Sequence, residues 1–241
     1  MPKNRLNSVK KIALIIFSLL LLAANDLSAQ KRLKNLPNYN NKKLHFGFSI
    51  GLNFYNFNIQ QIENLADVSG YYRAEGIVNP GYNVNIVTNF RLAEYLDFRF
   101  LPGFASTNRL IEFDVIEPLS QERQIVKREI VSSFFEFPFE LKYRSKRVDN
   151  YGLYVTTGFK YNLDLSSNEN VEDDRLFKIR GNDLGYELGF GIDMYFEFFK
   201  FSPQIKATFG VNNLLVQDGT FYVEGIERLE TRAILLNFTF E

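Results

Sequence analysis

The sequence predicts an all-β protein, an eight-stranded antiparallel up-and-down transmembrane β-barrel with an N-terminal signal peptide. Three observations favour this fold class. Eight stretches alternate apolar and polar residues, and a period of two places each kind of side chain on its own face of a strand. The connections between these stretches are alternately short and long, which is typical of outer-membrane barrels. The N-terminus has the features of an export signal.

Residues 1–29 are predicted to be a secretory signal peptide. Four basic residues precede an apolar run of 13 residues at positions 12–24. This run is too short to cross a bilayer as a helix, but it has the length of a signal-peptide core. We expect cleavage after Ala29; the alternatives are an uncleaved anchor or a buried helix. Because no cysteine follows the cleavage point, no lipid can be attached there.

The composition agrees with an exported barrel and excludes other classes of protein. The chain contains 25 Phe and 13 Tyr, and its mean hydropathy is below zero. This combination suits strands in which only every second residue meets lipid. The absence of Cys excludes a disulfide framework and thiolate chemistry. With 28 basic and 28 acidic residues, the chain offers no basic surface to a nucleic acid, and we expect contact with outer-membrane lipid instead.

Two segments are expected after the signal peptide. Residues 30–43 are polar and basic, and we expect an extended periplasmic N-terminal segment there; residues 44–241 should form the outer-membrane barrel domain. The eight strands are expected at about residues 44–59, 82–90, 98–115, 125–143, 151–163, 184–198, 201–211 and 234–240.

The connections predict the topology. Short turns are expected near residues 92–95, at residues 148–150 with Asn150 in the left-handed conformation, and at residues 199–200. The other four connections are long, including residues 60–78, and would lie outside the cell. An even number of strands then places both termini in the periplasm. The third and fourth strands alternate well beyond the roughly 9–11 residues that span a membrane, so a hairpin should project from it.

Three prolines fall inside the predicted strands, where each removes a ladder hydrogen bond. We expect Pro102 and Pro138 to mark bulges and Pro203 to lie at the rim near a turn.

The inward-facing residues predict a network of charges in the lumen. Their mixed signs on neighbouring strands favour paired charges over a catalytic cluster, and an eight-stranded barrel is just wide enough for its side chains to fill. The predicted network comprises Glu136, Glu140, Lys142, Lys160, Glu187, Asp193, Glu197 and Lys206. A two-residue turn at Phe199-Lys200 would place Asp193 opposite Lys206. The turn at residues 148–150 would place Glu140 diagonal to Lys160.

No catalytic residue, metal site or cofactor is predicted. The single histidine, His45, would lie at the periplasmic mouth, which favours a structural or binding role over that of a general base. Gly185, Gly189 and Gly191 share one face of a strand, so they should make room in the lumen and not cradle a phosphate. The acidic loop at residues 168–174 could bind calcium, but it lacks the EF-hand spacing, which favours a solvated loop.

Several blocks of sequence resemble the PorT/SprT family. The first is Leu36-Pro37-Asn38-Tyr39-Asn40 followed by Leu44-His45-Phe46-Gly47-Phe48-Ser49-Ile50-Gly51-Leu52-Asn53. The others are Leu96-Asp97-Phe98-Arg99-Phe100-Leu101-Pro102-Gly103, and Glu136-Phe137-Pro138 followed by Leu141-Lys142-Tyr143-Arg144-Ser145-Lys146-Arg147. The Glu-x-Pro and Leu-Lys-Tyr elements are shared with the wider outer-membrane beta-barrel superfamily. The resemblance implies an outer-membrane component of the type IX secretion system, needed for protein export and, in gliding bacteria, for gliding motility. Its partners would be other components of that system.

Three functions compete. The first is a non-enzymatic barrel of that secretion system, acting through partners and without a small-molecule substrate. The second is an adhesin or ligand-binding barrel that acts through its long extracellular loops. The third is an outer-membrane enzyme, which would need a histidine or an acidic cluster at the loops, and the sequence offers none. A secretion component could also use the periplasmic lead-in, where the candidate partner-binding residues are Leu36, Pro37, Tyr39 and His45.

Overall fold

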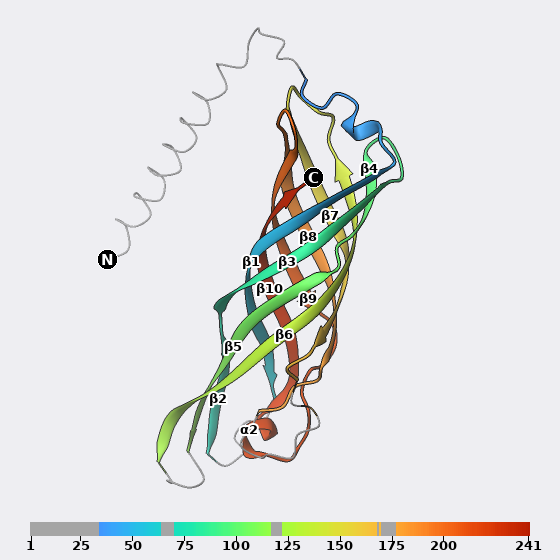
Figure 1. Cartoon of the computed structure of the whole chain (residues 1–241). Helices are drawn as coiled ribbons and strands as arrows, with labels where there is room; N and C mark the ends of the chain where they lie inside the picture. The colour runs from blue at the N-terminus through green and yellow to red at the C-terminus, as the bar shows by residue number, and fades with distance from the viewer. Residues whose placement is uncertain (1–33, 64–69, 117–121, 168, 170–176) are drawn as a thin grey trace, which may run out of the picture. The chain divides into compact units, whose positions relative to one another are not determined.

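The computed structural model describes residues 34–63, 70–116, 122–167, 169 and 177–241. The predicted signal peptide and its cleavage point lie outside the described residues. The unit from Lys34 to Glu241 forms one antiparallel sheet that closes into a barrel (Figure 1). Its strands are β1 (Leu44–Gln61), β2 (Tyr71–Ile77), β3 (Asn79–Arg91), β4 (Leu96–Phe100), β5 (Gly103–Ile116), β6 (Arg123–Arg144), β7 (Tyr151–Asp164), β8 (Asn182–Tyr195), β9 (Lys200–Gly210) and β10 (Ile226–Phe240).

These ten segments make eight barrel strands. Both β2 and β3 pair with β5, and both β4 and β5 pair with β3 and with β6. Thus β2 and β3 form one barrel strand, and β4 and β5 form another. The ring closes because β1 pairs with β3 on one side and with β10 on the other. The predicted eight-stranded up-and-down barrel is confirmed. Residues 71–77, which the sequence placed in a long connection, instead extend a strand as β2.

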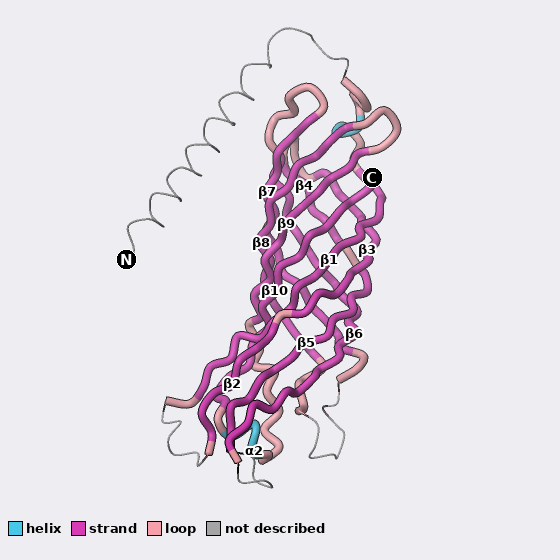
Figure 2. Tube along the Cα trace, turned by 90° about the vertical axis from the view of Figure 1, so that its left-hand side faces the viewer, coloured by secondary structure: helices cyan, strands magenta, loops and turns pink. Residues whose placement is uncertain are grey.

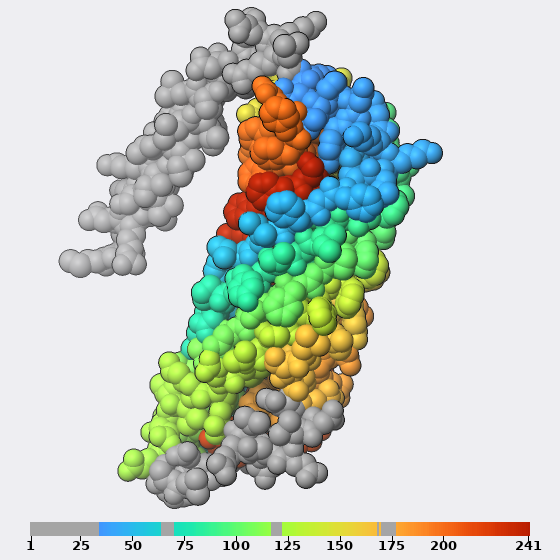
Figure 3. Space-filling model, viewed as in Figure 1, coloured from blue at the N-terminus to red at the C-terminus, as the bar shows by residue number. Residues whose placement is uncertain are grey.

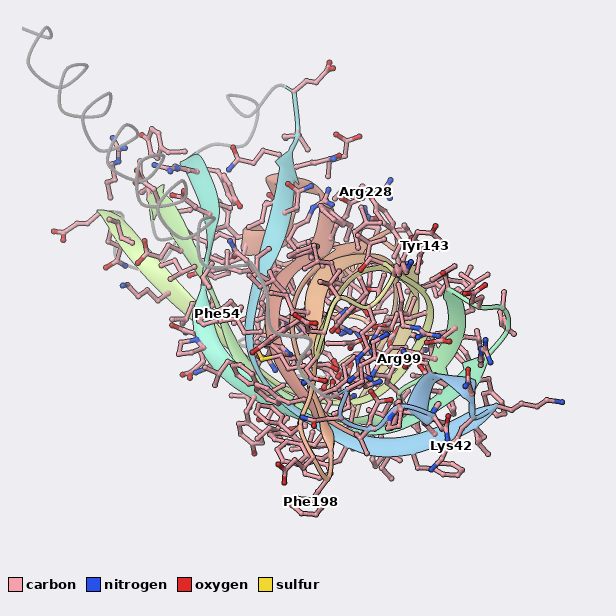
Figure 4. All side chains as sticks on the ribbon, turned by 90° about the horizontal axis from the view of Figure 1, so that it is seen from above. Lys42, Phe54, Arg99, Tyr143, Phe198 and Arg228 are labelled. Carbon is pink, nitrogen blue, oxygen red and sulfur yellow. The ribbon has the colours of Figure 1, made fainter. Side chains whose placement is uncertain are left out.

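The side chains alternate between the wall and the lumen. Along β8 the burial alternates residue by residue, with apolar side chains outward and polar ones inward. Seen along the barrel, Arg99 lies inside the ring of strands while Phe198 points away from it (Figure 4). Side chains of β1, β3, β5 and β6 form successive diagonal bands on the outer face, from blue to yellow-green (Figure 3). The outer wall is therefore apolar, as lipid requires.

The two ends of the barrel differ (Figure 2). The turn end carries the three short turns, the 3₁₀ helix η1 (Tyr39–Asn41) and the last residue of β10. The loop end carries the long connections, the short helix α2 (Phe221–Glu224) and the parts of β2, β5 and β6 that project from the barrel. The predicted projecting hairpin is confirmed as β5 and β6, which stay paired as far as Ile116 and Arg123.

The turn between β8 and β9 lies earlier than predicted. Phe196 N donates a hydrogen bond to Phe199 O at 2.9 Å, so the chain reverses at residues 197–198 and not at residues 199–200. Each β9 residue consequently faces a β8 partner four positions earlier than expected, and Lys206 lies opposite Gly189. The predicted register, which placed Asp193 opposite Lys206, is therefore wrong.

The turn between β6 and β7 also differs in detail. Val148 and Tyr151 form a bridge, and the residue with a positive φ is Asp149, at 49°, in place of the expected Asn150. Asp tolerates this left-handed conformation as Asn does. The register is nevertheless the predicted one, because Glu140 lies opposite Gly158 and thus diagonal to Lys160.

The expected bulges at Pro102 and Pro138 are absent. The register of β6 continues unchanged from β4 to β5. Leu101, in the break between β4 and β5, donates its N–H to Pro138 O at 3.0 Å. Pro138 has no N–H to return, and the Leu101 carbonyl accepts from Asn85 Nδ2 at 3.1 Å. A lumen side chain therefore replaces the lost ladder bond, and the strand needs no extra residue. Pro203 lies in β9 near the turn end.

An apolar core fills the loop end, and we call it the loop-end core. It is built by β1, the projecting strands, β10 and the connections that precede β8 and β10. Its buried residues are Phe57, Tyr71, Ala74, Ile111, Phe113, Val115, Ile130, Phe177, Ile179, Leu214, Leu215, Val223, Ile226 and Leu229. The guanidinium of the buried Arg109 lies over the Phe57 ring, 4.3 Å from its centroid, so the loop-end core meets the lumen directly.

Candidate functional site

The middle of the lumen holds two lysines between three carboxylates. Lys160 Nζ lies 2.8 Å from Glu136 Oε1 and 3.3 Å from Glu187 Oε1. Lys206 Nζ lies 2.7 Å from Glu140 Oε1 and 3.0 Å from Glu187 Oε2. Glu187 thus bridges the two lysines, and all five side chains are buried. Because burial strengthens the attraction and penalises an unpaired charge, these groups hold one another in place.

Two hydroxyl groups complete this cluster. The Tyr55 hydroxyl donates to Glu136 Oε1 at 2.9 Å and accepts from Lys160 Nζ at 2.8 Å. Thr208 Oγ1 donates to Glu187 Oε1 at 2.8 Å. These contacts join β1, β6, β7, β8 and β9 across the lumen. Backbone pairing joins each strand only to its neighbours in the ring, so the side chains connect strands that the sheet itself does not.

A second pair lies nearer the turn end. Lys142 Nζ lies 2.7 Å from Asp193 Oδ1, and Ser202 Oγ donates to the same oxygen at 2.6 Å. Lys142 also lies over the Tyr154 ring at 3.7 Å. Asp193 therefore pairs with a lysine two strands away, and not with Lys206 on the adjacent strand as the predicted turn required.

Seven of the eight predicted lumen residues are buried inside the barrel. The exception is Glu197, which is exposed in the turn after β8. The alternation of inward and outward side chains along β8 ends at Tyr195, where the strand ends and the turn begins. Glu197 is therefore not part of the lumen network.

Several members of the lumen network are not among the residues predicted from the sequence. At the turn end, Glu241 Oε2 lies 2.7 Å from Lys200 Nζ and 3.9 Å from Arg99. At the same end Arg144 Nε lies 2.7 Å from Asp97 Oδ2. At the loop end Arg109 lies 3.7 Å from Asp164 Oδ2 and donates to Ser132 Oγ at 2.6 Å. Each of these charged residues has at least one apolar neighbour in the chain, and this alternation is the signal by which they could have been found.

The strand glycines make room for these side chains. A Cβ at Gly189 would lie 2.9 Å from Lys206 Cγ and 2.8 Å from Gln204 Nε2, and one at Gly191 would overlap the Tyr154 ring. Their predicted place inside the barrel is confirmed. The small residues thus allow long charged side chains to cross the lumen at this level.

The described part of the periplasmic lead-in, residues 34–43, covers the turn end of the barrel and contains the 3₁₀ helix η1, so it is not extended as predicted. Asn35 donates its N–H to Asn150 Oδ1 at 2.9 Å and its side chain to Tyr195 O at 3.0 Å. The Tyr39 ring stacks on His45 at 4.2 Å. Lys200 Nζ lies over the Tyr39 ring at 4.7 Å.

Of the four lead-in candidates, His45, Tyr39 and Leu36 make contacts within the fold. His45 is buried and its Nε2 contacts Tyr39 O at 2.8 Å, and burial raises the pKa of the Tyr39 hydroxyl above its ordinary value. Arg147 donates to the Leu36 carbonyl at 3.4 Å, while Pro37 is exposed. The exposed side of the lead-in therefore includes Pro37.

Within the ranges that the structure describes, no group of three metal-ligating side chains comes together. Most of the acidic loop at residues 168–174 lies outside those ranges. No helix among the described residues is long and apolar enough to cross a membrane.

Comparison with known proteins identifies the family to which this chain belongs. The family model described as "Outer membrane protein beta-barrel domain" matches residues 28–216. No curated protein matches the chain. Among solved structures, the N-terminal β-barrel domain of Pseudomonas aeruginosa OprF is 10% identical, with 79% of this chain and 96% of that chain covered and a TM-score of 0.35. Neisserial surface protein A is 7% identical, with coverages of 82% and 98% and a TM-score of 0.42. The outer membrane protein AlkL is 9% identical, with coverages of 90% and 96% and a TM-score of 0.38. By the family match, this chain is an outer-membrane β-barrel protein and belongs to the outer membrane protein beta-barrel domain family.

Proposed function

We propose that this barrel is a non-enzymatic component of the type IX protein secretion system, which acts as a scaffold for other components and not as a pore. The observation that carries the scaffold role is the lumen. Buried ion pairs occupy it from Asp97 and Glu241 at the turn end to Arg109 at the loop end. The lead-in lies over one end and the loop-end core over the other. A barrel filled in this way offers its outer surfaces to partners.

The sequence blocks that resemble the PorT/SprT family support the specific system. In the fold these blocks gather toward the turn end. The lead-in and the first half of β1 lie there, β4 pairs with the end of β6, and β3 joins β4 to β1. The resemblance thus concentrates on one surface and is not spread over the loops. We infer that the turn end faces the periplasm and binds the partners there.

Deleting the gene is expected to stop export of type IX cargo while the bulk outer-membrane proteins stay unchanged. The reason is that a scaffold of the export machinery is needed for assembly and not for membrane integrity. The measurement is quantitative proteomics of culture medium and outer membranes, with the deletion strain complemented by the wild-type gene as control. Normal extracellular cargo in the deletion strain would reject the secretion role.

The proposed orientation can be tested with single cysteines, because the chain contains none. Gln217→Cys lies at the loop end and Lys146→Cys at the turn end, and both positions are exposed. On intact cells a membrane-impermeant maleimide is expected to label Gln217→Cys alone, and to label Lys146→Cys only after the outer membrane is permeabilised. Labelling of Lys146→Cys on intact cells would mean that the turn end faces outward.

The filled lumen predicts that the purified protein conducts no steady ionic current in planar bilayers. Each lumen charge has a partner within ion-pair distance in the middle cluster, so no continuous water column is expected to pass it. The steady ionic current is measured by recordings at both polarities, with a porin as the positive control. Steady single-channel steps from the wild-type protein would contradict the scaffold role.

An adhesin or ligand-binding barrel is the second candidate, and one feature favours it. A cavity of about 330 Å³ opens at the loop end, lined by residues of β6, of the end of β7 and of the connection to β8. Normal cargo export in the deletion strain would favour this function, and this cavity would then be a candidate site for the ligand.

A further inference from the structure

The outer wall over β1, β10 and β9 changes character abruptly along the barrel. Paired residues form rows across these three strands. The rows that run through Leu52, Leu236 and Ile205, and then through Phe54, Ile234 and Ala207, are apolar. The next row toward the loop end is Asn56, Arg232 and Phe209, followed by Asn58 with Glu230 and Gln60 with Arg228. The edge of the lipid-facing band on this wall therefore lies between the rows of Phe54 and Asn56.

A hollow lies at this edge. It has a volume of about 200 Å³, and its lining is almost wholly apolar. The walls are Phe54, Val78, Phe209 and Ile234, and Ala207 lies among them. Ala207 is the small member of its row, so the wall is recessed where its neighbours carry large side chains. In a membrane such a recess is filled by the apolar chain that packs into it, because an empty space would lose dispersion contacts.

Cationic groups lie beside the hollow on the loop side. Arg232 lines it, and its guanidinium lies over the Phe209 ring at 4.9 Å. Arg228 Nε holds Glu230 Oε1 at 2.7 Å, while Arg232 reaches the other oxygen of that carboxylate at only 3.5 Å. Two arginines thus share one acid, which leaves one net positive charge at the edge of the apolar band. A guanidinium at this depth suits the phosphate of a membrane lipid.

We propose that this hollow is a binding site for one anionic lipid, with acyl chains and a phosphate group, of the leaflet on the loop side. One acyl chain lies in the recess at Ala207, and Arg232 binds the phosphate. The site needs both parts, because an apolar recess alone would accept any lipid and a surface arginine alone would hold none in place.

The test is native mass spectrometry of the detergent-purified protein with added dimyristoylphosphatidylglycerol or dimyristoylphosphatidylcholine. Wild type is expected to retain one phosphatidylglycerol and little phosphatidylcholine. Arg232→Gln should reduce the phosphatidylglycerol adduct about tenfold, as expected for the loss of one charge-assisted hydrogen bond. Ala207→Phe should fill the recess and reduce the adduct as well.

Two matched controls separate the site from general effects. Arg73→Gln removes an exposed arginine of β2, and Thr157→Phe adds the same ring to an exposed position of β7, between Leu141 and Leu188. Both should bind lipid as wild type does, and heat-modifiable migration shows that each variant is folded. Equal retention of the two lipids, or equal adducts in the site variants and their controls, would overturn the proposal.

Discussion

Replacing Asp193 alone with leucine is expected to destabilise the barrel more than replacing Asp193 and Lys142 together. The single change leaves the Lys142 ammonium buried without the carboxylate that now lies 2.7 Å from it. Removing one partner of a buried pair costs ~3–5 kcal/mol, whereas replacing both with apolar side chains can cost little. The free energy of unfolding, from urea titration of the protein in lipid vesicles, should therefore rank Asp193→Leu below the Asp193→Leu, Lys142→Met double variant.

A second double-mutant cycle serves as the control for this result. Combining Asp193→Leu with Lys206→Met should give nearly additive losses, since Lys206 contacts Glu140 and Glu187 and not Asp193. Interaction energies of 0.5–3 kcal/mol, the typical range for residues in contact, are expected only for Asp193 with Lys142. Strong coupling of Asp193 to Lys206 would instead support the register that the sequence suggested.

Gly158→Val is expected to block folding of the barrel or to destabilise it severely. An added Cβ at Gly158 would overlap the Phe139 carbonyl oxygen and lie 2.8 Å from Glu140 Cα. Both are backbone atoms of the neighbouring strand, so the clash cannot be relieved by a change of rotamer. Overpacking typically costs about 1–3 kcal/mol, and a backbone clash should cost more. The measurement is the fraction of heat-modifiable protein in outer membranes.

Gly152→Val is the matched control, because Gly152 belongs to the same strand and an added Cβ there meets no atom within 4 Å. This variant should reach the outer membrane and shift in mobility on heating as wild type does. If both variants fold equally well, close strand contact is not the reason for a glycine at position 158. If both fail, the β-branched side chain itself disturbs β7.

The alternation of residues predicts much of this fold for a physical reason. In a barrel wall every strand has lipid on one face and the lumen on the other, so each residue's polarity reports its face. Glu187 and Lys206 could be placed inside on this ground alone. The same rule applies to Arg99 and Asp97, which alternate with Phe98 and lie in the lumen.

The partners of the lumen charges could not be predicted in the same way. A period of two is unchanged when one strand slides by two residues along the next, so it does not locate the turn. The reversal at residues 197–198 has no Gly or Asn to mark it. Moreover, Lys142 pairs with Asp193, and Lys206 pairs with Glu140 as well as with its neighbour Glu187. Asp193 and Glu140 lie on strands that do not adjoin those of their lysines, and such contacts across the lumen have no signature along the chain.

The loop-end core could not be predicted from the sequence, because many of its residues lie in the long connections and not in alternating strands. Leu214 and Leu215 follow Asn212-Asn213, and Phe177 follows an acidic stretch, so local composition suggested loops exposed to water. Their burial depends on the projecting strands, which bring Ile111 and Phe113 to the same place. Only the three-dimensional path of β5 and β6 beyond the barrel shows that these apolar residues have partners.

Closure of the ring has a consequence for the rate and order of assembly. The pairs that seal the barrel, such as Phe48 with Phe240, join the two most distant strands of the sheet in sequence. Contacts of such long range form slowly, because most of the chain must first be confined. Until then β1 and β10 each present an unpaired edge with an apolar face, the combination that recruits strands of other chains. The intermediate most prone to aggregation is therefore an almost complete sheet whose ring is still open. Its lifetime should limit the yield of folded protein at high protein concentration.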